Sequence, residues 1–277
     1  MSDELTRELE LATELARTAG EATLDHYRRR DLEVEHKGRS REPVTRADRA
    51  SEAIILEGLR GAFPDDGILS EEQEDRSSWA GRERAWIVDP LDGTRDFLEG
   101  LEGFTVMIGL LVEGTPRLGV VFQPTTGLCF RGVAGRGAEA IASDGKRQPL
   151  ACGAADEPSS LRLVVSNSHR SERTEQIKRA LGIAEEQRVG SVGLKISLIA
   201  RDTRDLYVHP TGHCKLWDTC APEAILTAAG GRMTDVRGAR LRYAPDNLFV
   251  DEGIVASNGR CHDQVIERVS ALLPSPL

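Results

Sequence analysis

Residues 104–142 contain four short apolar segments separated by turn signals, and this pattern restricts the possible folds more than any other part of the chain. The segments are 104–112, 117–123, 128–134 and 138–142. Short apolar runs joined by turns that contain glycine or proline are typical of strands that pair with their neighbours in sequence. The sequence therefore predicts an antiparallel β-meander.

Helical periodicity precedes the meander. Apolar residues recur every three to four positions over 4–28 and again over 46–62, which predicts two amphipathic helices. Two short strands are predicted to follow, at 68–69 and 86–88. The second is expected to stop at the next residues, because Pro90 cannot donate a hydrogen bond to a central ladder.

The chain after residue 150 alternates between predicted strands and predicted helices. The strands are 161–165, 206–209 and 253–256, and the helices are 172–181, 194–200, 221–229 and 262–273. Alternation of this kind predicts layers of helix and sheet. We therefore expect an N-terminal α+β half, 1–150, with the antiparallel sheet, and a C-terminal α/β half, 151–277.

Charge and cysteine content exclude several classes of protein. The formal net charge of −9 argues against a nucleic-acid polymer as partner, although it is compatible with a small anionic substrate. The five cysteines are odd in number and form no CxxC pair, which favours free thiols in a reducing, cytoplasmic compartment. The first ten residues lack the apolar core of a signal peptide, and the longest apolar run is too short to cross a membrane.

Acidic residues recur at the predicted ends of strands and starts of helices. They occur in Ser70-Glu71-Glu72, in Asp89-Pro-Leu-Asp-Gly-Thr94, in Trp217-Asp218 and in Thr45-x-x-Asp48. Such positions are where layered α/β proteins present ligand-binding groups. The four segments are therefore candidates for one functional site.

Asp89 and Asp92 are close enough in sequence to repel each other unless a cation neutralises them. Mg²⁺ prefers oxygen ligands, and Glu71 and Asp218 would supply more of them if the fold brought them near. A carboxylate-bound Mg²⁺ usually handles phosphate. Backbone N–H groups at the helix start after Gly93 would suit a phosphate oxygen.

Each segment also has an ordinary structural explanation. Asp92-Gly93 is a common turn, and Thr45-x-x-Asp48 has the pattern of a helix capping box. Asp218 would equally open a helix, and Glu71 would equally belong to a solvated acidic loop. Spacing alone leaves both interpretations open.

Together the four segments resemble those of the inositol monophosphatase superfamily of lithium-sensitive, Mg²⁺-dependent phosphatases. The D-P-x-D-G-T motif corresponds to residues 89–94, and the W-D motif with its later A-G-G corresponds to 217–218 and 229–231. The Glu-Glu at 71–72 and the V-T-x-A-D segment at 44–48 complete the pattern in the family's order, over nearly the whole chain. The resemblance implies a layered αβαβα sandwich of the inositol monophosphatase/fructose-1,6-bisphosphatase type.

The resemblance also implies roles for individual residues. Two or three Mg²⁺ ions would be held by Glu71, Asp89, the carbonyl of Leu91, Asp92 and Asp218. Thr94, paired with Asp48, would orient and help to deprotonate the attacking water, and Glu71 would take part in catalysis. The N–H groups of Gly93 and Thr94 would bind phosphate, and Asp218 would also contact the substrate. Family members are often dimers, which allows a homodimer here.

Within the superfamily, several segments resemble the bacterial 3′(2′),5′-bisphosphate nucleotidases, which convert adenosine 3′,5′-bisphosphate, a by-product of sulfate assimilation, to AMP and phosphate. These segments are 69–72, 89–97 and 102–106. The resemblance implies that His169 and Lys195 contact the second phosphate or the adenine side, whereas ordinary loop and solvated-helix positions would also explain both residues.

One segment departs from the nucleotidase pattern. Ser191-Val192-Gly193 stands before Leu194-Lys195, and inositol-phosphate enzymes tend to carry the same Ser-Val-Gly. An inositol 1-phosphate or fructose 1,6-bisphosphate phosphatase therefore remains the alternative. A non-catalytic binding or regulatory member is a more distant one, because every expected metal ligand is present.

Overall fold

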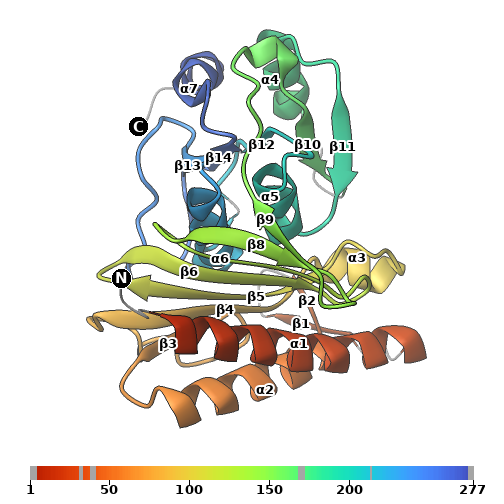
Figure 1. Ribbon diagram of the computed structural model, residues 1–277, viewed down its shortest axis with the longest axis vertical. Helices are drawn as coiled ribbons and strands as arrows, with labels where there is room; N and C mark the ends of the chain where they lie inside the picture. The colour runs from red at the N-terminus through yellow and green to blue at the C-terminus, as the bar shows by residue number, and fades with distance from the viewer. Residues whose placement is uncertain (1–4, 31–33, 38–41, 168–171, 213, 274–277) are drawn as a thin grey trace.

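Five alternating layers of helices and sheets form this computed structural model, in which residues 5–30, 34–37, 42–167, 172–212 and 214–273 are described (Figure 1). Two helices cover a seven-stranded sheet, two more form the middle layer, and the last two cover the outer face of a five-stranded sheet (Figure 1). In layer order the helices are α1 (Thr6–Arg29), α2 (Arg46–Ala62), α5 (Val192–Ala200), α6 (Leu216–Ala228), α4 (Glu172–Leu181) and α7 (His262–Ser270). This arrangement confirms the predicted αβαβα sandwich.

The seven-stranded sheet contains the predicted meander. Its strands follow one another in chain order: β3 (Gly67–Ser70), β4 (Arg84–Asp92), β5 (Thr105–Val112), β6 (Thr115–Gln123), β7 (Leu128–Val133), β8 (Gly137–Ile141) and β9 (Arg147–Leu150). β3 pairs with β4 in parallel, and every later neighbour pairs antiparallel. The meander is thus confirmed, with one further strand, β9, at its edge.

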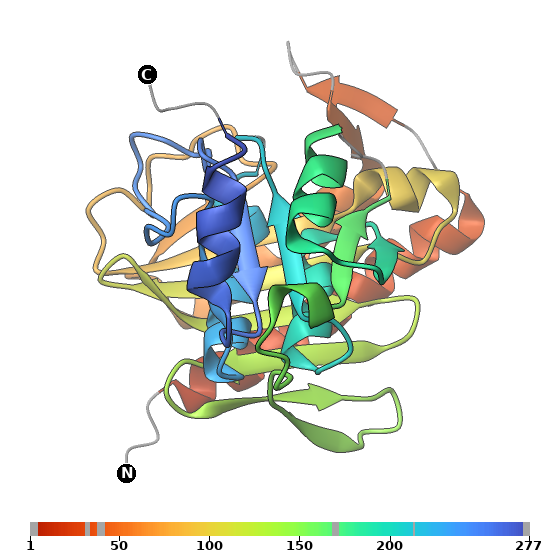
Figure 2. The same cartoon turned by 90° about the horizontal axis from the view of Figure 1, so that it is seen from above.

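The five-stranded sheet mixes parallel and antiparallel pairs. Its order is β11 (Glu186–Val189), β10 (Leu163–Ser166), β12 (Leu206–His209), β14 (Ile254–Ser257) and β13 (Arg232–Asp235). The view from above shows α4 and α7 lying across this sheet, and a separate two-stranded pair near α3 (Figure 2). The remaining elements are β1 (Val34–Lys37), β2 (Glu42–Thr45), α3 (Thr94–Glu99) and the 3₁₀ helix η1 (Pro158–Ser160). No helix in the described ranges has the length and apolarity of a membrane span.

The middle helices are buried between the two sheets, which explains why α5 is mainly apolar and has no solvated polar face. Ile196 and Ile199 of α5 and Ile225 of α6 are all fully buried in one core cluster that draws on both sheets. α6 also approaches the seven-stranded sheet closely: a Cβ placed on Gly119 would lie 2.1 Å from the carbonyl oxygen of Ala221. A glycine in β6 is therefore what lets α6 sit at this depth.

Two predicted boundaries were wrong. β4 does not stop before Pro90 but continues to Asp92, because an irregularity in the β4–β5 ladder accommodates the proline. α6 begins at Leu216 rather than near residue 221, and Pro222 lies inside the helix. A proline is disfavoured inside a helix, but burial of Trp217 and the hydrogen bond from the Lys215 N–H to Asp218 stabilise the earlier start.

Candidate active site

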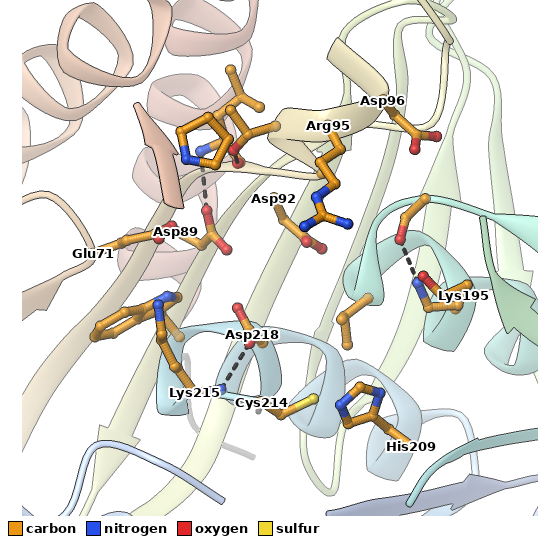
Figure 3. Close-up of a pocket in the computed structure, with 18 of the residues that line it drawn as sticks. Glu71, Asp89, Asp92, Arg95, Asp96, Lys195, His209, Cys214, Lys215 and Asp218 are labelled. Carbon is orange, nitrogen blue, oxygen red and sulfur yellow. Dashed lines mark hydrogen bonds between the residues drawn. The ribbon is translucent and has the colours of Figure 1, made fainter. Parts of the chain in front are cut away.

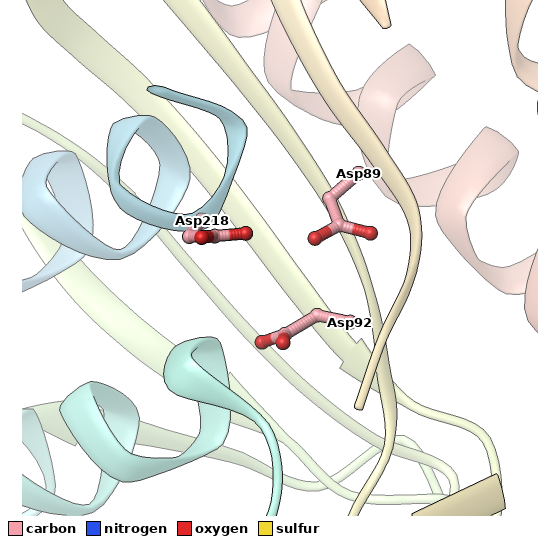
Figure 4. Close-up of side chains that lie close together, drawn as sticks. All are labelled: Asp89, Asp92 and Asp218. Carbon is pink, nitrogen blue, oxygen red and sulfur yellow. The ribbon is translucent and has the colours of Figure 1, made fainter. Parts of the chain in front are cut away.

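Three aspartates from two distant parts of the chain meet in one cluster. Asp89 and Asp92 come from the end of β4, and Asp218 comes from the first turn of α6. Each offers a carboxylate oxygen within 4.8 Å of the others. Figure 4 shows the three side chains facing one another. The convergence that the sequence suggested but could not demonstrate is therefore present in the fold.

The irregularity in β4 explains why Asp89 and Asp92 face the same space. Asp89 pairs with Met107 and Asp92 pairs with Thr105, so three steps along β4 correspond to two steps along β5. Residues three apart in a regular strand point to opposite faces. The extra residue in β4 restores the alternation and brings both carboxylates to one side.

Hydrogen bonds hold the bulge and the Asp89 carboxylate in place. The N–H of Leu91 donates to Asp89 Oδ1 at 3.0 Å. Ser51 of α2 donates its hydroxyl to the carbonyl of Pro90 at 2.7 Å. The distorted end of β4 is thus fixed to the outer helix layer as well as to its own sheet.

Asp92 is held by the first turn of α5. Asp92 Oδ2 accepts a bond from the Ser191 hydroxyl at 2.5 Å and another from the N–H of Gly193 at 2.9 Å. The same hydroxyl accepts from the N–H of Leu194 at 2.9 Å and hydrogen bonds to the Thr105 hydroxyl at 2.7 Å. Sequence reasoning assigned Ser191 no role in the site, although a serine directly before a helix is a typical N-cap.

Asp218 and Asp48 occupy equivalent positions in the first turns of their helices. Asp218 Oδ2 accepts from the N–H of Lys215 at 2.8 Å. Asp48 Oδ2 accepts from the N–H of Thr45 at 2.8 Å and from its hydroxyl at 2.6 Å, which forms the predicted capping box. In both helices, one carboxylate oxygen is committed to the helix start and fixes the orientation of the side chain.

Burial and mutual repulsion make the aspartate cluster costly to ionise. Burial raises the pKa of Asp89 well above its ordinary value, and the negative charges of Glu71, Asp92 and Asp218 raise it further. Burial raises the pKa of Asp92 too, although Lys195 opposes the rise. Burial and then Asp92 raise the pKa of Asp218 to about 8.

This donor set fits a hard divalent cation. All three groups offer carboxylate oxygens, the ligands that Mg²⁺ prefers, and a bound cation would remove the repulsion that raises their pKa values. The cluster could therefore bind a metal ion.

The cluster opens into a pocket of about 380 Å³ between the seven-stranded sheet, α5 and α6. Figure 3 shows Glu71 approaching from the opposite side to Lys195, with the aspartates between them. Gly93 and Thr94, at the start of α3, also line the pocket. Gly93 has a φ of 93°, and a Cβ there would lie 2.9 Å from the carbonyl oxygen of Gly103. The close turn after Asp92 therefore requires glycine.

The contacts of Thr94, Asp48 and Lys195 differ from those predicted for them. The Thr94 hydroxyl donates to the carbonyl of Leu91 at 3.2 Å, and Asp48 serves its capping box, so the Thr94–Asp48 pair stays a prediction. Lys195 lines the pocket but is only 1% exposed, which excludes the solvated-helix interpretation. Its ammonium donates to the carbonyls of Val189 and Gly190. His169 lies outside the described residues.

The fold and this site define a class of enzyme: the chain belongs to the inositol monophosphatase family, which it matches over residues 4–273, and it is a phosphatase. It is 36% identical over 255 residues to the 3′(2′),5′-bisphosphate nucleotidase CysQ of Salmonella typhimurium, covering 88% of this chain and 97% of that protein. It is 34% identical over 265 residues to the histidinol-phosphatase of Chlorobaculum parvum, covering 92% and 93%. The solved inositol monophosphatase of Anabaena matches with a TM-score of 0.76 at 29% identity, covering 98% of each chain.

Proposed function

We propose that this protein is a Mg²⁺-dependent phosphomonoesterase whose preferred substrate is adenosine 3′,5′-bisphosphate. The observation that carries the metal-dependent chemistry is the convergence of Asp89, Asp92 and Asp218 within 4.8 Å in a pocket beside the N–H groups of Gly93 and Thr94. The predicted ligands are Glu71, Asp89, the carbonyl of Leu91, Asp92 and Asp218. When bound, Mg²⁺ would supply positive charge at the phosphate and lower the pKa of a coordinated water.

The residues of this chain would then orient the reaction. The N–H groups of Gly93 and Thr94 would receive phosphate oxygens, since they stand beside the cluster at the start of α3. Thr94 would hold the attacking water through its hydroxyl, with Asp48 as its partner once the substrate is bound. Ser191 and the first turn of α5 would keep Asp92 in place throughout.

Arg95 supports a substrate with a second anionic group. This residue is exposed, lines the pocket and has no acidic partner within the described ranges. Figure 3 shows it extending from α3 toward the pocket near Asp92 and Asp96. A guanidinium there suits the second phosphate of a bisphosphate. Lys195, whose ammonium already serves two carbonyls, is a weaker candidate for that contact than the sequence suggested.

A substrate panel with Mg²⁺ tests the proposal. It contains adenosine 3′,5′-bisphosphate, inositol 1-phosphate, fructose 1,6-bisphosphate and histidinol phosphate, the last because of the relative at 34% identity. We expect the highest kcat/KM for adenosine 3′,5′-bisphosphate. If kcat/KM for another substrate is about tenfold or more higher, which corresponds to about 1.4 kcal/mol in transition-state binding, the nucleotidase assignment is wrong.

Asp92→Asn tests the metal chemistry independently of the substrate. It keeps the size of the side chain but removes one charge from the cluster. We expect kcat/KM to fall by more than about 100-fold, the upper end of what outer-shell metal partners cost. Calorimetric titration with Mn²⁺ should show a parallel loss of binding. Unchanged phosphate release in this variant would favour a different mechanism, and no release by the unaltered protein would favour a non-catalytic role.

A further inference from the structure

Arg76 connects the loop that carries Glu71 to the helix that carries Asp218. It lies between β3 and β4 and is half-buried. Its guanidinium donates to the carbonyl of Glu71 at 2.7 Å and to the carbonyl of Gln73 at 3.1 Å. The same guanidinium lies over the indole of Trp217, 5.0 Å from the ring centroid. One side chain thus contacts both walls of the pocket.

The main chain around Glu71 is fixed from several sides. The N–H of Glu71 donates to the carbonyl of Val88 at 3.2 Å, and its carbonyl accepts from Arg76. The N–H of Glu72 donates to Glu52 Oε1 of α2 at 3.2 Å. These bonds determine where the backbone of Glu71 lies, while its side chain lines the pocket.

The other end of the connection is a rigid anchor. Trp217 is 2% exposed, belongs to the main core cluster and directly precedes Asp218. A guanidinium can place its planar face on an aromatic ring while its edge donates two bonds in fixed directions. An ammonium lacks that planar geometry. Arginine is therefore suited to hold the loop against α6 in a way that lysine is not.

We propose that Arg76 is a positioning residue that holds Glu71 at a fixed place relative to Asp218, and that divalent-cation affinity depends on it. This inference rests on the proposed function, since it takes Glu71 as a metal ligand. If Arg76 acted only through its charge, its removal would change the divalent-cation affinity in the opposite direction. A positive side chain beside a cation site repels the cation, so its removal would tighten binding if charge were all that mattered.

The test compares Arg76→Ala and Arg76→Lys with Arg82→Ala, using Mn²⁺ alone as the probe and calorimetry as the readout. Arg82 is a matched control because it lies in the same loop and is exposed, and its contact with the Asp65 carbonyl is 3.5 Å long. We expect both Arg76 variants to bind Mn²⁺ about tenfold or more weakly, as for other outer-shell partners of metal ligands. Arg82→Ala should stay within about threefold of the unaltered protein.

Mn²⁺ binding by Arg76→Ala that equals or exceeds that of the unaltered protein overturns the inference. If Arg76→Ala does not fold, as judged by circular dichroism, Arg76→Lys decides the matter, because it retains the charge and the long side chain. Failure of the proposed function looks different: the unaltered protein would then bind no Mn²⁺, or Asp92→Asn would bind it equally well. If Asp92→Asn loses Mn²⁺ binding and the Arg76 variants retain it, the assignment of the metal site stands and only the role of Arg76 is refuted.

Discussion

Replacing Ser191 with alanine should destabilise the fold and release Asp92, because one hydroxyl group serves three partners. This oxygen donates to Asp92 at 2.5 Å, accepts from the N–H of Leu194 at 2.9 Å and lies 2.7 Å from the Thr105 hydroxyl. Its single proton goes to Asp92, so Thr105 is the donor in the third bond. The Ser191 side chain is fully buried.

The cost can be assembled from these three bonds. Loss of an N-cap side chain costs about 1 kcal/mol. Loss of a hydrogen bond to a charged group costs about 1.5 to 3 kcal/mol, and a buried hydroxyl left without its acceptor costs about 1 kcal/mol more. Because the three terms share one oxygen atom, they overlap. We expect Ser191→Ala to lower the free energy of unfolding by about 3 to 4 kcal/mol.

Urea unfolding measures this loss, and the same helix offers a matched control. Ser197 is also fully buried in α5, but its hydroxyl has no hydrogen-bond partner among the described residues. Ser197→Ala should therefore change the free energy of unfolding by less than about 0.5 kcal/mol, or increase it. Equal losses in the two variants would refute the reasoning, since they would show that any serine-to-alanine change in α5 is equally harmful.

Two further predictions concern stability. Burial lowers the pKa of His262 from 6.5 to about 4. Between these two pH values the unfolded chain binds a proton that the folded protein does not bind, so the free energy of unfolding decreases as the pH falls from 6.5 to 4. Urea titrations from pH 7 to pH 4 should show the unaltered protein losing about 3 kcal/mol more than His262→Gln; parallel profiles would assign the acid sensitivity to other groups. Gly119→Ala should cost about 1 to 3 kcal/mol and weaken Mn²⁺ binding, because its Cβ would push Ala221 and with it the start of α6 away from the sheet. Thermal melting and calorimetry measure the two effects, and a fully stable variant with normal Mn²⁺ binding would contradict the close approach.

Sequence reasoning succeeded where local patterns are strong. The helix over 46–62 has the predicted bounds, and the Thr45–Asp48 capping box was readable from four residues. Two edge strands, β9 and β11, were missed for the opposite reason. β9 and β11 contain mainly exposed polar residues, so they lack the apolar alternation from which strands are predicted. Their pairing depends on the neighbouring strand rather than on their own side chains.

The site was predictable as a set of candidates but not as an arrangement. Asp89, Asp92 and Asp218 were identified from the sequence, and the structure brings them together. The support for Asp92 comes from Ser191, 99 residues away, and no local pattern connects the two. Lys195 was expected to reach the substrate, yet only the packing of α5 against the second sheet shows that its ammonium is buried. Such contacts arise from tertiary structure alone.

The buried charges of the pocket predict an order in which its ligands bind. Asp89, Asp92 and Asp218 share the pocket with the half-buried Glu71. Among the described residues, the cations that line it are the buried Lys195 and, farther out, Arg95 and Lys215. A phosphate monoester carries close to two negative charges near neutral pH, so these carboxylates would repel it when they are ionised. The first turns of α5 and α6 offset part of that charge. The N–H of Gly193 in α5 donates to Asp92, and the N–H of Lys215 at the start of α6 donates to Asp218. Burial and then Asp92 still raise the pKa of Asp218 to about 8, so the cluster carries its full negative charge only when a cation compensates it. We therefore predict that a phosphate monoester binds to this pocket only after a divalent cation has bound to the aspartate cluster.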